Sequence, residues 1–174
     1  VREGGPVLDR AAGGGRHGRY FLERGHPVTL VDRQTEALLD LEPDPRATVI
    51  QADLEDGSPW PLNEKFAGVV VVNYLHRPLT ENLLESLEPG GLLIYETFAR
   101  GNENFSRPRN PDHLLKSGEL LQVVLGRLQI IAYEHGIREK SPLQGVIQRI
   151  CAVNNLDQSV REDREPQVLN LEPN

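Results

Sequence analysis

Methionine is absent from the 174 residues of this chain, and cysteine is nearly so. The single cysteine, Cys151, has no partner for an intrachain disulfide, which excludes a disulfide-stabilised scaffold. Zinc sites need several cysteines or histidines at short spacings, and the five histidines show no such spacing. We therefore expect no metal site and a reducing compartment, the cytoplasm.

Long hydrophobic runs and an excess of basic residues are also missing. No run of about 18 apolar residues and no basic-plus-apolar leader is present, so we expect neither a membrane span nor a signal peptide. Lys and Arg number 19 against 26 Asp and Glu, giving a net charge of -7. Since a nucleic-acid partner usually requires a basic surface, this charge argues against one. The chain begins at Val1 rather than methionine, and we expect further residues to precede it.

Strand-like and helix-like segments alternate along the chain, which is typical of an α/β fold with helices on both faces of a sheet. The apolar run at 69–72 is continuous, as expected for a strand buried on both faces. The expected strands are Val7–Asp9, Val28–Val31, Thr48–Gln51, Gly68–Asn73, Gly91–Thr97, Leu128–His135 and Val146–Asn154. The expected helices are Gly18–Arg24, Thr35–Leu41 and Leu79–Leu87. The acidic residues from 157 onward show little periodicity and indicate a solvated tail.

A short apolar strand runs directly into the glycine-rich turn of V-L-D-R-A-A-G-G-G at 7–15. Glycine admits positive φ and lets main-chain N–H groups approach a ligand, so this turn indicates a nucleotide-cofactor loop. The spacing Gly13-x-Gly15-x-x-Gly18, with Asp32 nineteen positions after Gly13, also satisfies the dinucleotide fingerprint. Asp9 argues against that alternative, because its carboxylate would repel a pyrophosphate and attract an ammonium group instead.

Polar residues close the first four expected strands, where a doubly wound sheet binds its ligands. Asp32 can accept hydrogen bonds from two vicinal ribose hydroxyls. Asp53 can accept from an adenine amine, while Leu54 offers a backbone N–H to the ring. The side-chain carbonyl of Asn73 can accept from an ammonium group. Together with Asp9, these contacts describe an adenosine that carries an amino acid.

On these residues the chain resembles the class I S-adenosylmethionine-dependent methyltransferases, from Val7 to about Val153. The stretch at 101–121 is similar to a subset related to tellurite-resistance and thiopurine methyltransferases. The resemblance implies a Rossmann-like, doubly wound, mostly parallel sheet of seven strands with the last one antiparallel. It also implies S-adenosyl-L-methionine as cofactor. The expected cofactor contacts are Asp9, Ala11, Gly13, Gly15, Asp32, Arg33, Asp53, Leu54, Asn73 and Leu75.

The resemblance also bears on the limits of the domain. Family members usually carry a helix before the first strand, and only six residues precede Val7 here. We therefore expect a methyltransferase domain at 1–155 whose N-terminal helix is missing, followed by a polar tail at 156–174.

Methyl transfer from a sulfonium needs an acceptor held in line more than it needs an acid or a base. His76 is the expected proton acceptor, with Tyr74 as a second catalytic candidate. The expected substrate residues are Arg77, Tyr95, Glu96, Thr97 and Arg107. The acidic chain favours a small-molecule acceptor. Two alternatives remain open, a non-catalytic relative that binds the cofactor and an NAD(P)-binding oxidoreductase.

Overall fold

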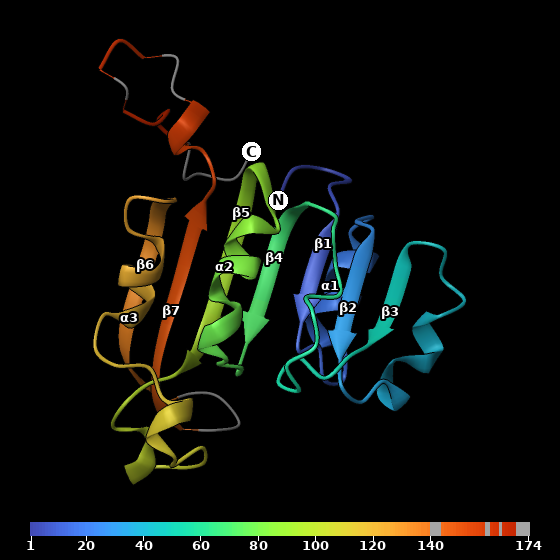
Figure 1. The fold of residues 1–174 in the computed structure, drawn as a ribbon, viewed down its shortest axis with the longest axis horizontal. Helices are drawn as coiled ribbons and strands as arrows, with labels where there is room; N and C mark the ends of the chain where they lie inside the picture. Colours follow the sequence, from blue (N-terminus) through green and yellow to red (C-terminus); the bar gives the residue numbers. More distant parts are fainter. Residues whose placement is uncertain (140–143, 159–160, 164, 170–174) are drawn as a thin grey trace.

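The computed structural model describes residues 1–139, 144–158, 161–163 and 165–169. Over these residues the chain forms a seven-stranded sheet with the order β3-β2-β1-β4-β5-β7-β6, seen side by side in Figure 1. The strands are β1 Val7–Arg10, β2 Val28–Asp32, β3 Ala47–Gln51, β4 Phe66–Val72, β5 Leu87–Phe98, β6 Gln129–Arg138 and β7 Gly145–Val153. Neighbouring strands pair in parallel from β3 to β5, whereas β7 pairs antiparallel with both β5 and β6. The predicted fold class is confirmed.

Helices cover both faces of the sheet. Three helices, α1 Arg16–Glu23, α2 Thr80–Glu85 and α3 Glu119–Val124, lie between strands, with short 3₁₀ turns elsewhere. Leu22 of α1 packs with Val7, whereas Leu83 of α2 packs with Leu8. Since consecutive strand residues point to opposite faces, α1 and α2 lie on opposite sides of the sheet. Within the part of the chain that the structure describes, one large hydrophobic core lies on each face, and Phe98, Leu114 and Ile147 form a third, smaller cluster. Among the described residues, none of the helices is long and apolar enough to cross a membrane.

The element boundaries differ from the sequence prediction in a few places. The segment predicted as a helix at Thr35–Leu41 is the 3₁₀ helix η1, Glu36–Leu41. Strand β5 begins at Leu87, before the Pro-Gly-Gly turn expected to precede it, and its pairing with β4 is irregular between Phe66 and Gly68. That irregularity accommodates the turn within the strand. The predicted tail at 156–174 falls partly outside the described residues and stays a prediction.

Candidate cofactor site

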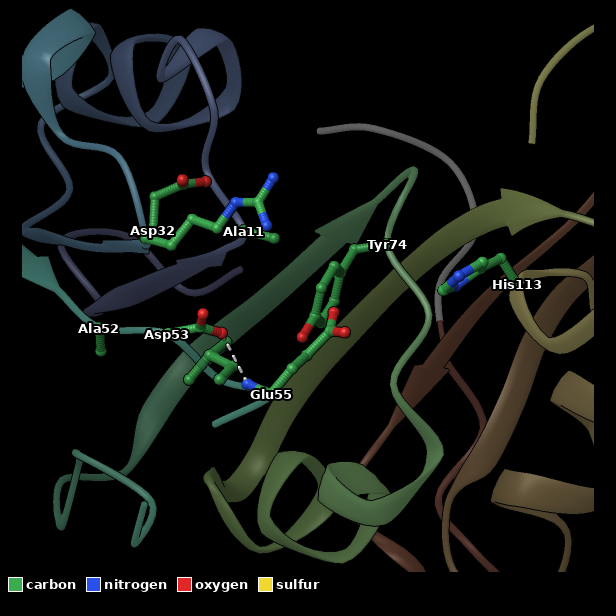
Figure 2. Close-up of a pocket in the computed structure, with 9 residues that line it drawn as sticks. Ala11, Asp32, Ala52, Asp53, Glu55, Tyr74 and His113 are labelled. Atoms are coloured by element: carbon green, nitrogen blue, oxygen red, sulfur yellow. Dashed lines mark hydrogen bonds between the residues drawn. The ribbon is translucent and has the colours of Figure 1, made fainter. Parts of the chain in front are cut away.

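A cavity of about 430 Å³ opens at the carboxyl ends of the parallel strands, where six of the predicted residues meet. It is lined by Ala11, Asp32, Arg33, Ala52, Asp53, Leu54, Glu55, Tyr74 and His113. Figure 2 shows the carboxylates of Asp32 and Asp53 on one side of this cavity and the ring of Tyr74 on the other. The loops after β1, β2, β3 and β4 all contribute because parallel strands end at the same edge of the sheet.

The glycine-rich loop between β1 and α1 has a left-handed backbone at three positions. Ala11, Gly13 and Gly15 have φ values of 56°, 53° and 71°. A Cβ on Gly13 or Gly14 would meet no atom within 4 Å, so the backbone there faces open space. The N–H groups of Gly13 and Gly15 are bonded within the protein, to Asp32 and to the carbonyl of Ala12, so the predicted cofactor contacts of these glycines stay predictions.

Gly15 and Gly18 are needed for packing instead. A Cβ on Gly15 would lie 2.6 Å from a methyl carbon of Leu38, and one on Gly18 would lie 2.5 Å from a methyl carbon of Leu30. These glycines let α1 approach β2 and η1 closely. The close approach fixes the position of the loop above the sheet.

Asp32 connects the loops that follow β1 and β2. One carboxylate oxygen accepts a hydrogen bond from the N–H of Gly13 at 2.7 Å, and the other accepts from the N–H of Gln34 at 3.0 Å. A carboxylate oxygen has two lone-pair directions, so each oxygen can accept a further donor from the cavity. This geometry suits a pair of hydroxyl groups.

Asp9 lies beneath the loop and is absent from the cavity wall. Its side chain is only 1% exposed, and Oδ2 accepts a hydrogen bond from the N–H of Gly18 at 2.8 Å. Burial raises the pKa of Asp9 to about 7, and the neighbouring Asp32 acts in the same direction. The bond from Gly18 and the charge of Arg16 oppose this shift. A cation bound above the loop would favour the ionised form of Asp9.

Glu55 and His113 line the cavity although the sequence prediction did not include them. The N–H of Glu55 donates to Oδ1 of Asp53 at 2.9 Å, and the Glu55 side chain lies beside Tyr74 (Figure 2). His113 comes from the segment at 101–118, so no local signal in the sequence connects it with Tyr74. Buried Asn102 organises that segment by donating to the carbonyls of Ser106 and Pro108.

Arg77, a predicted substrate residue, is bound within the protein. Its guanidinium donates to the carboxylate of Glu119 at 2.6 and 3.1 Å and to the carbonyls of Asp112 and Leu114 at 2.5 and 3.0 Å. These contacts join the segment after β4 to the loop that carries His113. The preceding residue, His76, is the half-buried N-cap of the 3₁₀ helix η2, Arg77–Leu79.

Arg77→Ala is expected to lower the melting temperature and to speed proteolysis within 101–118, because two carbonyls and a carboxylate lose their donor. Differential scanning fluorimetry and limited trypsin digestion measure these effects. Arg127→Ala, which breaks an exposed pair with Glu81, serves as the matched control. Unchanged stability and digestion would show that Arg77 does not hold this loop.

The three predicted residues at the end of β5 point to different environments. Tyr95 is 5% exposed, and its hydroxyl donates to the carbonyl of Tyr74 at 2.9 Å. Thr97 is buried. Glu96 lies on the opposite face of the strand, where Arg138 binds it at 2.6 Å. None of the three lines the cavity at the strand ends, whereas Tyr95 and Glu96 both line a second cavity between β5, β6 and β7.

The remaining predicted residues lie outside the cavity wall. Asn73 has a φ of 56° and donates its backbone N–H to the carbonyl of Glu96 at 2.9 Å. Leu75 packs against the hydrophobic core on the α2 side. Arg107 is exposed in the loop after β5. Their roles stay predictions.

The fold is similar to that of several solved structures. TehB from Haemophilus influenzae aligns with a TM-score of 0.72 and 16% identity, over 88% of this chain and 58% of that chain. An S-adenosylmethionine-dependent methyltransferase from Mesorhizobium loti aligns with a TM-score of 0.69 and 18% identity, over 88% and 93%. The glycopeptide N-methyltransferase MtfA, complexed with S-adenosyl-L-homocysteine, aligns with a TM-score of 0.60 and 22% identity, over 87% and 84%.

This chain thus spans less than two thirds of the TehB chain, at 58%. No protein-family model and no curated protein sequence matches it. The similarity at this level of identity concerns the course of the backbone. The chain has the fold of the S-adenosylmethionine-dependent methyltransferases.

Proposed function

We propose that the chain binds S-adenosyl-L-methionine in the cavity at the strand ends and transfers its methyl group to a small-molecule acceptor. The observation that carries this proposal is the meeting of the carboxylates of Asp32 and Asp53 at one cavity, with the glycine-rich loop held beside it by the hydrogen bond from the N–H of Gly13 to Asp32. The similar structures support it, since MtfA and NodS were each crystallised with S-adenosyl-L-homocysteine.

The donor and acceptor groups of the cavity suit this cofactor. Asp32 would accept hydrogen bonds from the two ribose hydroxyls, and Asp53 would accept from the adenine amine. The backbone N–H of Leu54 would donate to the adenine ring. When bound, the cofactor supplies a methyl group that its positively charged sulfur already activates.

The protein's own contribution is to orient the acceptor and to receive its proton. Holding the reacting atoms in line can supply about 7–11 kcal/mol of the barrier reduction. Of the two catalytic candidates, Tyr74 lines the proposed cofactor cavity and His76 does not. His76 follows in the same loop and would receive the proton when the acceptor is a thiol, hydroxyl or amine. A reducing, cytoplasmic location fits the single cysteine.

Asp32→Ala is expected to weaken binding of S-adenosyl-L-homocysteine at least tenfold, about 1.4 kcal/mol, because two charge-assisted hydrogen bonds to ribose are lost. Isothermal titration measures the change. The control is Asp44→Ala. In the wild type the carboxylate of Asp44 pairs with Arg46 just before β3, at the amino ends of the parallel strands. Equal affinity of the wild type and Asp32→Ala would contradict the ribose contact. A parallel titration with NADH tests the oxidoreductase alternative, which tight NADH binding would favour.

A further inference from the structure

Arg10, the last residue of β1, carries a buried guanidinium with two unsatisfied donors. The residue is 1% exposed, and neither Nε nor Nη2 has a hydrogen-bond partner among the described residues. A buried charged donor without an acceptor costs more than a neutral one, so such a group normally has a partner. The structure therefore shows a site that lacks its acceptor.

Aromatic rings surround this guanidinium without satisfying its N–H groups. The central carbon of Arg10 lies 5.6 Å from the ring centre of Trp60 and 5.0 Å from that of Tyr74. Rings at this distance attract the positive charge but accept no hydrogen bond along the N–H edge. The hydroxyl oxygen of Tyr74 is buried, and the side chains of Glu55 and Arg10 lie near enough to act on its pKa. The Nε and Nη2 donors of Arg10 thus lack an acceptor within hydrogen-bond distance among the described residues.

The unsatisfied edge of Arg10 has the geometry for a carboxylate. Nε and Nη2 form the side-on fork that binds both oxygens of a planar anion. Elsewhere among the described residues, the same two atoms of an arginine bind both oxygens of one carboxylate in four pairs. These pairs are Arg2–Glu88, Arg46–Asp44, Arg77–Glu119 and Arg161–Asp163.

Arg10 lies directly behind the wall of the cavity. Tyr74, which packs on its guanidinium, lines that cavity, and so does Glu55. The charge of Glu55 acts on both Arg10 and Tyr74. Glu55 makes no hydrogen bond to the fork, although its charge favours the charged form of Arg10. A ligand carboxylate that enters beside Tyr74 would compete with the negative charge of Glu55.

We propose that Arg10 is a carboxylate-binding residue of this site, whose Nε–Nη2 fork receives the carboxylate of a bound ligand. This inference rests on the proposed function, which offers two sources of that group. One is the methyl acceptor, and the other is the amino-acid end of S-adenosylmethionine. In either case Tyr74 donates its hydroxyl to the same carboxylate.

Trp60 provides the readout, because it is the single tryptophan of the chain and packs on Arg10. Benzoate, a small planar carboxylate, is expected to change the fluorescence of Trp60 saturably, whereas neutral benzamide is not. Arg10→Leu should abolish the saturable change, and Arg10→Lys should weaken binding at least tenfold, since lysine has no fork. Glu55→Gln should tighten binding several-fold because it removes a like charge.

The matched control is Arg24→Leu, which removes an exposed arginine that packs on Tyr20 outside the cavity. It should bind benzoate as the wild type does. Isothermal titration repeats the comparison without depending on Trp60. Benzoate binding that is unchanged in Arg10→Leu, together with unchanged binding of the ligands below, would overturn the proposal.

A second pair of ligands identifies the source of the carboxylate. S-adenosyl-L-homocysteine carries the amino-acid end, and 5′-methylthioadenosine lacks it. If the cofactor occupies the fork, Arg10→Leu weakens binding of the first and leaves the second unchanged. If the acceptor occupies it, Arg10→Leu binds both normally but loses benzoate. Binding of S-adenosyl-L-homocysteine to the wild type is measured separately. A wild type that binds it while Arg10→Leu changes no ligand's affinity would contradict the role of Arg10 alone, whereas a wild type that does not bind it would contradict the proposed function.

Discussion

Asp9→Asn is expected to stabilise the fold at pH 8 by up to about 4 kcal/mol and to leave it nearly unchanged at pH 4. The wild-type carboxyl is buried, and its pKa in the folded protein is raised from 3.8 to about 7. Each unit of such a shift corresponds to about 1.4 kcal/mol. Asparagine keeps an oxygen that can accept the hydrogen bond from Gly18, but it bears no charge.

The sign of this pH dependence follows from whether Asp9 holds a proton in the folded and in the unfolded state. Between about pH 4 and 7 the folded protein keeps the proton on Asp9, while the unfolded chain has lost it. The stabilisation of the fold by Asp9 is therefore complete below the pKa of Asp9 in the unfolded chain. It is lost as the pH rises through the pKa of Asp9 in the folded protein. Urea unfolding of both proteins from pH 4 to 8 gives the difference directly.

Asp44→Asn is the control with the opposite sign. Hydrogen bonds from Arg46 hold the pKa of Asp44 below its usual value, so its stabilisation is lost as the pH falls. A difference between wild type and Asp9→Asn that stays constant from pH 4 to 8 would show that Asp9 does not titrate as described. The same substitution should weaken S-adenosyl-L-homocysteine binding at pH 8, because the ammonium group loses a nearby charge.

Arg10→Leu is expected to raise the free energy of unfolding by about 1 to 4 kcal/mol. Replacing a buried, imperfectly paired ion by an apolar side chain of similar size is often stabilising by this amount. Burial also lowers the pKa of Arg10, which shows that the fold disfavours its charged form. The lost attraction to Trp60 and Tyr74 offsets part of the gain.

Thermal unfolding checks this expectation, since each kcal/mol shifts the melting temperature of a domain of this size by about 2–4 °C. Arg24→Leu, at an exposed site, should leave the melting temperature close to that of the wild type. A lower melting temperature for Arg10→Leu would mean that the guanidinium supports the fold rather than a ligand. A gain in stability with loss of carboxylate binding would identify Arg10 as a residue kept for function at the expense of stability.

Much of the site was predictable because it depends on local sequence. Asp32 ends β2 and Asp53 follows β3, and parallel strands bring their carboxyl ends to one side of the sheet, where both residues line the cavity. The glycine loop was recognisable for the same reason, since positive φ at Gly13 and Gly15 is a property of the residue type.

The rest depends on contacts between distant parts of the chain. The role inferred for Arg10 depends on its contacts with Trp60 and Tyr74, which lie 50 and 64 positions later in the sequence. No periodicity indicates whether an arginine at a strand end is buried. His113 reaches the cavity because Arg77 holds its loop. The sequence also did not show that Arg77 donates to Glu119 and to the carbonyls of Asp112 and Leu114.

The antiparallel insertion of β7 has a consequence for synthesis on the ribosome. Strand β7 is the last to emerge, yet it lies between β5 and β6, and β6 pairs only with β7 among the described strands. Until residue 153 has left the exit tunnel, β5 presents an open edge and β6 has nothing to join. Open strand edges invite pairing between chains. A translational pause just before residues 145–153 would therefore leave these strand edges open and favour aggregation of the nascent chain.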